Sequence, residues 1–134
     1  MDIPKQYLSL FILIIFVTTN LSHAESIVKI YNGLGSTMRF RCKSKDTDLG
    51  YQSVPPHAMW LFSFQRNFFG RSLYYCYFDL PNGRRWFDIY KEPRDTSDSD
   101  YWKNDCVWKI TPSGPCKYNE YRTQTTLCFP WNKN

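Results

Sequence analysis

Cysteine is the residue type with the greatest chemical potential in this chain of 134 residues. Its five copies offer disulfide formation or metal ligation; they are Cys42, Cys76, Cys106, Cys116 and Cys128. Structural zinc sites use short spacings such as CxxC together with histidine, and no CxxC pair occurs here. We therefore expect disulfide bonds and no metal site. Because five is odd, one thiol is left free or pairs between two molecules.

The other residue types that carry catalysis give no catalytic pattern. Only one histidine, His57, lies beyond the first 24 residues, which excludes a ribonuclease with a histidine acid and a histidine base. His57 follows Pro55-Pro56, so we interpret it as a surface turn residue. The sequence has no phosphate-binding glycine loop, nucleophile elbow or HExxH motif, and no spacing marks a pair of glycosidase carboxylates. We expect no enzymatic activity and no cofactor.

The first residues predict that the protein is exported. Lys5 is followed by the uncharged run Leu8–Val17 and then by Ser22-His23-Ala24, which offers small residues to a signal peptidase. The apolar run of about ten residues is shorter than the roughly twenty that cross a bilayer. We predict a signal peptide at residues 1–24, a mature domain at residues 25–134, and a secreted, extracellular location where disulfides persist.

Charge does not identify a partner. Cleavage after Ala24 removes one basic residue, Lys5, and one acidic residue, Asp2, so the net charge of +5 is unchanged. Basic residues alternate with apolar ones in Met38–Lys43, as on a solvated sheet face, and form no run of the kind that binds nucleic acid. No segment has the periodicity of a basic amphipathic helix. We therefore expect neither a nucleic-acid partner nor stable membrane insertion.

The elements that must position these residues are predicted to be strands. Short apolar or alternating runs are separated by turn residues at the spacing of a sandwich or barrel, and helical periodicity is absent. We expect about eight short antiparallel strands in one all-β domain. Their predicted ranges are Ser26–Tyr31, Thr37–Lys43, Met59–Phe64, Ser72–Leu80, Arg85–Tyr90, Cys106–Thr111, Cys116–Asn119 and Thr125–Phe129.

Local turn chemistry makes one pairing specific. Pro81-Asn82-Gly83 contains an Asn-Gly pair, which tolerates positive φ, so the runs on either side of it should form a β-hairpin. Turns are also expected at Gly33-Leu34-Gly35 and at Pro55-Pro56.

Aromatic residues make up 19% of the chain. At strand periodicity most of these rings are expected in the core, among them Trp60, Phe62, Phe64, Trp86 and Trp108. An alternative function, a secreted carbohydrate- or cell-wall-binding module, requires several exposed rings on one face. The candidates for such a patch are Tyr51, Tyr74, Tyr77, Tyr118 and Tyr121.

Six segments in this order resemble the plant self-incompatibility protein family, the S-protein homologues. They are Cys42–Gly50 (CKSKDTDLG), Asn67–Cys76, Trp86–Tyr90, Cys106–Ile110, Gly114–Cys116 and Leu127–Asn132. The resemblance implies a compact β-sandwich of about eight strands, which agrees with the strands predicted from periodicity. It also implies a secreted plant signalling ligand, since founding members of the family reject self pollen through a pollen membrane receptor. A plant cell-surface receptor is thus the expected partner.

The resemblance also bears on the cysteines. Many relatives carry a further cysteine shortly before the position of Cys106, where this chain has Tyr101–Asp105. By the family pattern we expect Cys116 and Cys128 to bridge each other and two of Cys42, Cys76 and Cys106 to form the second bond. The protein is then a monomer, or a dimer linked through the odd cysteine.

Recognition by a sandwich is expected to lie in its loops. The family-typical segment Lys43–Gly50 is expected to maintain the fold, so we favour the longer charged segment Lys91–Asp105 as the partner-binding loop. Its mixed charges would set specificity, and two aromatic residues would anchor the contact. The candidate residues are Lys91, Glu92, Arg94, Asp95, Asp98, Asp100, Tyr101 and Trp102.

Overall fold

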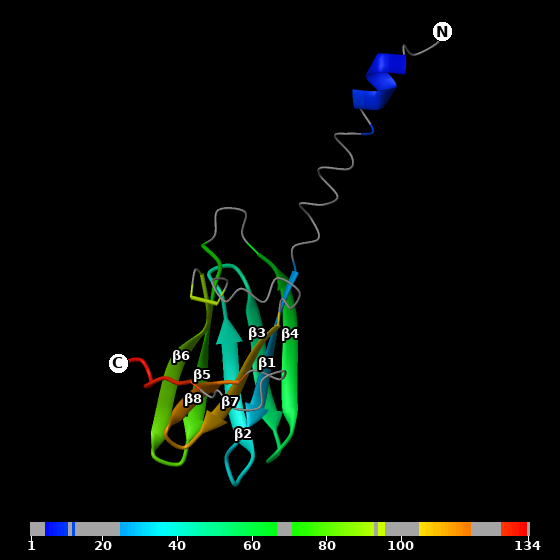
Figure 1. Cartoon of the computed structure of the whole chain (residues 1–134). Helices are drawn as coiled ribbons and strands as arrows, with labels where there is room; N and C mark the ends of the chain where they lie inside the picture. Colours follow the sequence, from blue (N-terminus) through cyan, green and yellow to red (C-terminus); the bar gives the residue numbers. More distant parts are fainter. Residues whose placement is uncertain are drawn as a thin grey trace.

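Two β-sheets packed face to face form the body of the protein (Figure 1). The computed structural model describes residues 5–10, 12, 25–66, 71–92, 94–95, 105–118 and 127–133. Residues 5–10 are helical, and the strands begin at Glu25. Within these ranges, no helix has both the length and the apolar character needed to cross a membrane.

Nine strands occur in the described part of the chain. The five-stranded sheet has the order β4 (Met59–Gln65), β1 (Glu25–Asn32), β7 (Asp105–Thr111), β8 (Gly114–Lys117) and β9 (Leu127–Cys128). The four-stranded sheet has the order β3 (Asp48–Val54), β2 (Met38–Lys43), β5 (Leu73–Leu80) and β6 (Gly83–Lys91). The all-β class predicted from periodicity is therefore confirmed.

Strand direction and number differ from the prediction in two places. β1 and β7 run parallel, whereas all pairs were expected to be antiparallel. A parallel pair needs a crossover connection, and here β4 and the whole four-stranded sheet lie between the two strands in sequence. β3 was not predicted, because Gly50, which has a φ of 76°, gives this segment the composition of a turn. Asn119, Thr125 and Thr126, at the ends of two predicted strands, lie outside the described residues.

The predicted hairpin is confirmed. β5 and β6 pair antiparallel from Leu80 opposite Gly83 onward, with Pro81 and Asn82 forming the turn between them. Gly83 has a φ of 123°, a backbone conformation that residues with a Cβ rarely adopt. His57 also lies in a turn, is exposed and has a φ of 65°, in agreement with its interpretation as a surface turn residue.

The core is an aromatic layer contributed by both sheets. Phe40 of β2 meets Trp60 of β4 edge-on, with ring centroids 5.3 Å apart. Phe87 of β6 meets Trp108 of β7 in the same way, at 5.0 Å. Each large side chain buried in this way contributes about 1.5–3 kcal/mol through the hydrophobic effect. Trp60, Phe62, Phe64 and Trp108 lie in or against the core as expected.

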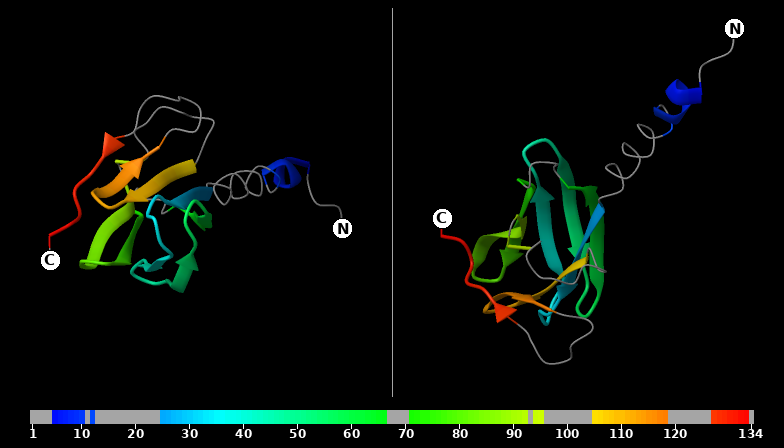
Figure 2. Two further views of the ribbon diagram at one scale, coloured as in Figure 1. Left: turned by 90° about the horizontal axis from the view of Figure 1, so that it is seen from below. Right: turned by 45° about the horizontal axis from the view of Figure 1, so that its top comes forward.

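The C-terminal segment covers the edge of the sandwich beside β6. The backbone N–H of Asn132 donates to the carbonyl of Trp86 at 3.0 Å, and the Trp131 ring lies 5.5 Å from the ring of Phe78. Figures 1 and 2 show this segment, in red, running from β9 along β6. Phe129 reaches the core rings of Phe87 and Trp108, so the segment closes the space between the two sheets.

Candidate functional site

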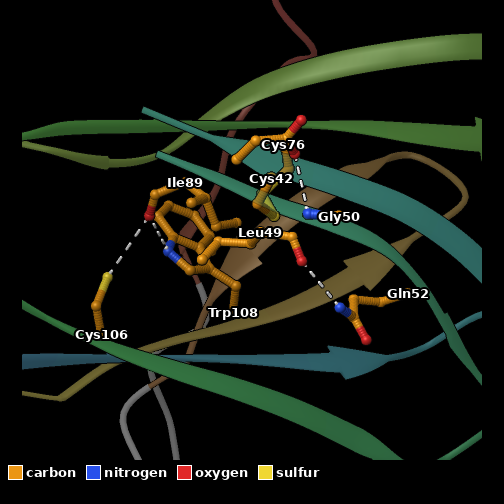
Figure 3. The surroundings of a disulfide bond; sticks show 9 residues. Cys42, Leu49, Gly50, Gln52, Cys76, Ile89, Cys106 and Trp108 are labelled. Carbon is orange, nitrogen blue, oxygen red and sulfur yellow. Dashed lines mark hydrogen bonds between the residues drawn. A yellow bond between two sulfur atoms is a disulfide. The ribbon is translucent and has the colours of Figure 1, made fainter. Parts of the chain in front are cut away.

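The cysteines of the described strands form two disulfides. Cys42 of β2 bonds Cys76 of β5, and Cys116 of β8 bonds Cys128 of β9. The Cys116–Cys128 pairing is the one that the family resemblance implied. Figure 3 shows the Cys42–Cys76 bond between the two central strands of its sheet, beside Trp108 and Leu49. The first bond thus joins central strands, and the second attaches the C-terminal segment.

Cys106 carries the remaining thiol, and this thiol lies inside the sandwich. The residue is 4% exposed, and its Sγ lies 3.9 Å from the carbonyl oxygen of Ile89, which also accepts a 2.7 Å hydrogen bond from Trp108 Nε1. Burial raises the pKa of the Cys106 thiol to about 12, which suppresses the reactive thiolate. A thiol in this position is out of reach of a second folded chain, which argues against a dimer linked through Cys106.

The predicted partner-binding segment is described only near its ends. Lys91 ends β6 and is exposed, Glu92 accepts a hydrogen bond from the Tyr90 hydroxyl at 3.1 Å, and Arg94 and Asp95 follow. The other candidates, Asp98, Asp100, Tyr101 and Trp102, lie outside the described residues.

Asp95 has a structural role that the sequence did not indicate. Its side chain is 0% exposed and accepts hydrogen bonds from the Lys91 backbone N–H at 2.7 Å, from Arg94 at 2.7 Å and from Lys117 Nζ at 3.1 Å. The expectation that the Asp95 carboxylate is displayed to a partner is therefore wrong for the described fold. The Asp95 carboxylate neutralises Arg94 and Lys117 and links the start of the loop to β6 and β8.

Arg94 is turned toward the sandwich as well. Its guanidinium carbon lies 5.1 Å from the ring centroid of Phe87 and 5.2 Å from that of Trp108, at cation–π distance. Its Nη2 also donates to the carbonyl of Asp88 at 2.6 Å. Arg94 thus links the loop to the aromatic core, and of the four described candidates it is Lys91 that is exposed.

Lys43–Gly50, expected as a loop that maintains the fold, is a short turn followed by the start of β3. The Asp48 carboxylate accepts hydrogen bonds from Arg41 Nε at 3.0 Å, from Arg41 Nη2, and from the backbone N–H of Gly50 at 2.9 Å. The side-chain hydrogen bonds from Arg41 hold the pKa of Asp48 well below its usual range. These hydrogen bonds link the start of β3 to β2.

The aromatic patch required by the carbohydrate-binding alternative forms only in part. Tyr51 is 47% exposed and Tyr77 is partly exposed, and both lie on the outer face of the four-stranded sheet. Tyr74 points inward, with its ring 4.7 Å from that of Phe64. Tyr118, which follows β8, is 39% exposed, and Tyr121 lies outside the described residues.

The outer face of the four-stranded sheet combines cations with aromatic rings. Tyr51, Arg41, Tyr77 and Trp86 lie directly opposite one another across β3, β2, β5 and β6. Residues opposite each other on neighbouring strands share a face. We call this surface the basic–aromatic face and define it by Arg39, Arg41, Lys43, Tyr51, Tyr75, Tyr77, Arg84 and Trp86.

The expectation that Trp86 lies in the core is wrong. Trp86 is partly exposed and is paired with Tyr77, whereas its neighbour Phe87 is buried opposite Cys76. Strand alternation places one of two successive aromatic residues inside and the other outside, and periodicity alone does not say which. The alternation of Met38–Lys43 had marked the basic half of this face, but not the aromatic half.

Within the described ranges, no cluster of three His, Cys, Asp or Glu side chains could hold a metal ion. The described residues thus combine an anchored loop start with a charged, aromatic sheet face.

Comparison with known proteins places the chain in a family. The profile of the family described as plant self-incompatibility protein S1 matches residues 27–131. The chain belongs to this family. S-protein homolog 2 of Arabidopsis thaliana is 47% identical, with 100% of this chain and 99% of that protein covered. S-protein homolog 18 and S-protein homolog 3 of the same plant are 41% and 37% identical over 90% and 82% of this chain, covering 89% and 75% of those proteins.

The family assignment includes the strands that carry both disulfides and the basic–aromatic face, since the match runs from β1 to Trp131. S-protein homolog 2 also aligns with the residues before β1, where the sequence predicts a signal peptide. The resemblance deduced from six segments of the sequence is therefore confirmed.

Proposed function

We propose that this protein is secreted by a plant cell and acts as a ligand for a receptor protein on a cell surface. Membership in the self-incompatibility family supports a role in recognition between cells. The apolar run at Leu8–Val17 supports export, and two disulfides suit an oxidising, extracellular environment.

The observation that carries the proposal is the anchoring of the segment between β6 and β7. At its start, the buried Asp95 carboxylate binds Arg94, Lys117 and the backbone of Lys91. At its end, Asp105 of β7 forms an ion pair with Lys29 of β1 at 3.2 Å. Both ends of the segment are thus fixed to the sandwich.

Fixed ends reduce the conformational entropy that a binding loop loses when it meets its partner. The candidates that remain for direct contact are Lys91, Glu92, Asp98, Asp100, Tyr101 and Trp102. Tyrosine and tryptophan are the residue types that most often dominate the energy of protein–protein contacts, so Tyr101 and Trp102 are proposed as the anchors.

Binding of labelled protein to intact plant cells tests the proposal. Replacing both aromatic residues (Tyr101→Ser, Trp102→Ser) should weaken saturable binding at least about thirtyfold, because a central aromatic anchor contributes about 2 kcal/mol or more. The matched control is Tyr118→Ser, which removes an exposed ring outside the segment. Equal binding by the wild type and by the double variant would exclude this segment as the contact.

A further inference from the structure

The basic–aromatic face differs in charge from the outer face of the opposite sheet. At the outward positions of its four strands lie five cations and three carboxylates, for a net charge of +2; these are Arg39, Arg41, Lys43, Arg84 and Lys91, with Asp48, Asp79 and Asp88. The charged outward residues of β1 and β7 sum to zero; these are Glu25, Lys29, Asp105 and Lys109. Positive charge is thus gathered on one side of the sandwich.

The cations on this face are held in place by its aromatic rings and carboxylates. The guanidinium carbons of Arg39 and Arg41 lie 4.5 Å and 5.0 Å from the centroid of the Tyr51 ring. Arg84 Nε donates to Asp79 at 2.9 Å. Arg41 and Arg84 also hydrogen-bond the hydroxyl of Tyr51, which lowers the pKa of that hydroxyl.

Arg39 is the cation best placed to bind a ligand. It is exposed, and its partner in the described structure is the Tyr51 ring rather than a carboxylate. A guanidinium carries five N–H donors, so a contact between its carbon and an aromatic ring is compatible with a bidentate contact to an incoming carboxylate. The ring beneath it is still 47% exposed and offers apolar surface beside the charge.

Aromatic surface continues across the sheet from this point. Tyr77 and Trp86 follow in the same transverse row, and the Tyr75 ring lies 5.8 Å from that of Tyr77. Three inter-strand spacings separate Tyr51 from Trp86, which corresponds to about 14 Å. Such a row suits an extended ligand that alternates apolar faces with hydroxyl and acidic groups.

We propose that the basic–aromatic face binds a linear polysaccharide that carries carboxylate groups, such as a chain of uronic acids. The C–H faces of the sugar rings pack on the exposed aromatic surface, and the carboxylates pair with Arg39 and its neighbouring cations. This proposal does not rest on the receptor proposal, because it concerns a different surface and a different class of partner.

The same observations do not favour nucleic acid. Duplex DNA carries one charge for about every 1.7 Å of its axis, and proteins bind it through many unpaired cations. On this face Arg41 and Arg84 already contact Asp48 and Asp79, so the net charge is low for such a partner. A membrane surface would favour several exposed aliphatic residues among the cations, whereas here Leu73 is the one exposed aliphatic side chain on the described strands of this sheet, and the rings of Tyr51, Tyr75, Tyr77 and Trp86 make up most of the remaining apolar surface.

Sodium polygalacturonate is the probe, with its methyl-esterified form as the matched control that has the same backbone and fewer charges. The protein is expressed from the full-length sequence in a secreting host, and affinities are measured by calorimetry at about 0.15 M ionic strength, where the Debye length is about 8 Å. We expect wild-type protein to bind the acidic polymer, and to bind the esterified polymer about tenfold more weakly. Arg39→Gln should weaken binding to the acidic polymer about tenfold, because it removes one charge-assisted hydrogen bond. Tyr51→Thr should weaken binding similarly.

Lys109→Gln is the protein control, because it removes one exposed positive charge from β7 of the opposite sheet. Its affinity should stay within about twofold of wild type, as expected for a distant charge that is screened by salt. Absence of binding to polygalacturonate, equal loss with Lys109→Gln and Arg39→Gln, or tighter binding to duplex DNA would each overturn the proposal. None of these results would affect binding of the protein to a receptor.

Discussion

Replacement of Asp95 by asparagine tests the anchor of the β6–β7 segment. The change preserves the size of the side chain but removes the negative charge that faces Arg94 and Lys117. The NH2 group of the asparagine is a hydrogen-bond donor, as are Arg94 and Lys117, so it cannot replace the carboxylate oxygen that accepted from them. Its remaining oxygen would still accept the Lys91 N–H, so the loss is mainly one of charge pairing.

The size of the effect follows from burial. Removing one partner of a buried ion pair costs roughly 3–5 kcal/mol. The Asp95 side chain is 0% exposed, but those of Arg94 and Lys117 are 26% and 21% exposed and can turn toward water. We therefore expect the free energy of unfolding to fall by about 3 kcal/mol, at the low end of this range. For a domain of this size, such a loss lowers the thermal midpoint by about 12 °C.

Thermal unfolding followed by circular dichroism, with the disulfides intact, measures this shift. Asp79→Asn is the matched control, because it makes the same chemical change in an exposed ion pair with Arg84. It should lower the midpoint only slightly, since exposed pairs contribute little. If Asp95→Asn and Asp79→Asn unfold at the same temperature, the Asp95 cluster does not anchor the segment.

The cysteines give two further predictions. Replacing Cys116 and Cys128 with alanine should lower the free energy of unfolding by about 3 kcal/mol. Replacing Cys42 and Cys76 with alanine should lower it by about 4 kcal/mol or more, because this bond closes a longer loop and both side chains are buried. Denaturant titration measures both losses, and the reverse order would contradict this prediction. Burial raises the pKa of the folded Cys106 thiol to about 12, from an ordinary value of 9.0. Between these pH values the folded state therefore holds a proton that the unfolded state has released, so the free energy of unfolding falls as pH rises. Cys106→Ala should reduce this fall; identical slopes for variant and wild type between pH 9 and pH 12 would refute it.

The sequence predicted the elements better than their arrangement. Alternation and turn residues were enough for the all-β class and for the β5–β6 hairpin, because both depend on residues close together in the chain. The parallel pairing of β1 with β7 depends on contacts between residues nearly eighty positions apart, such as Val28 and Cys106. Local pattern contains no information on such pairings.

The candidate site was predicted less well, for reasons of orientation. Asp95 stands in a run of charged residues that reads as a solvated loop, yet its carboxylate is buried because Arg94 and Lys117 converge on it. Trp86 and Phe87 are adjacent aromatic residues, and only the pairing of β6 with β5 decides that Phe87 faces the core. The free cysteine was likewise left open among three until Cys42 and Cys76 were seen to pair.

Binding of the labelled protein to intact plant cells, before and after protease treatment of the cell surface, tests the proposed receptor role most directly. We predict saturable binding that protease abolishes, because the proposed partner is a protein. Saturable binding that survives protease and is competed by polysaccharide or by salt would contradict a receptor ligand and would leave binding to the cell wall as the function of the protein.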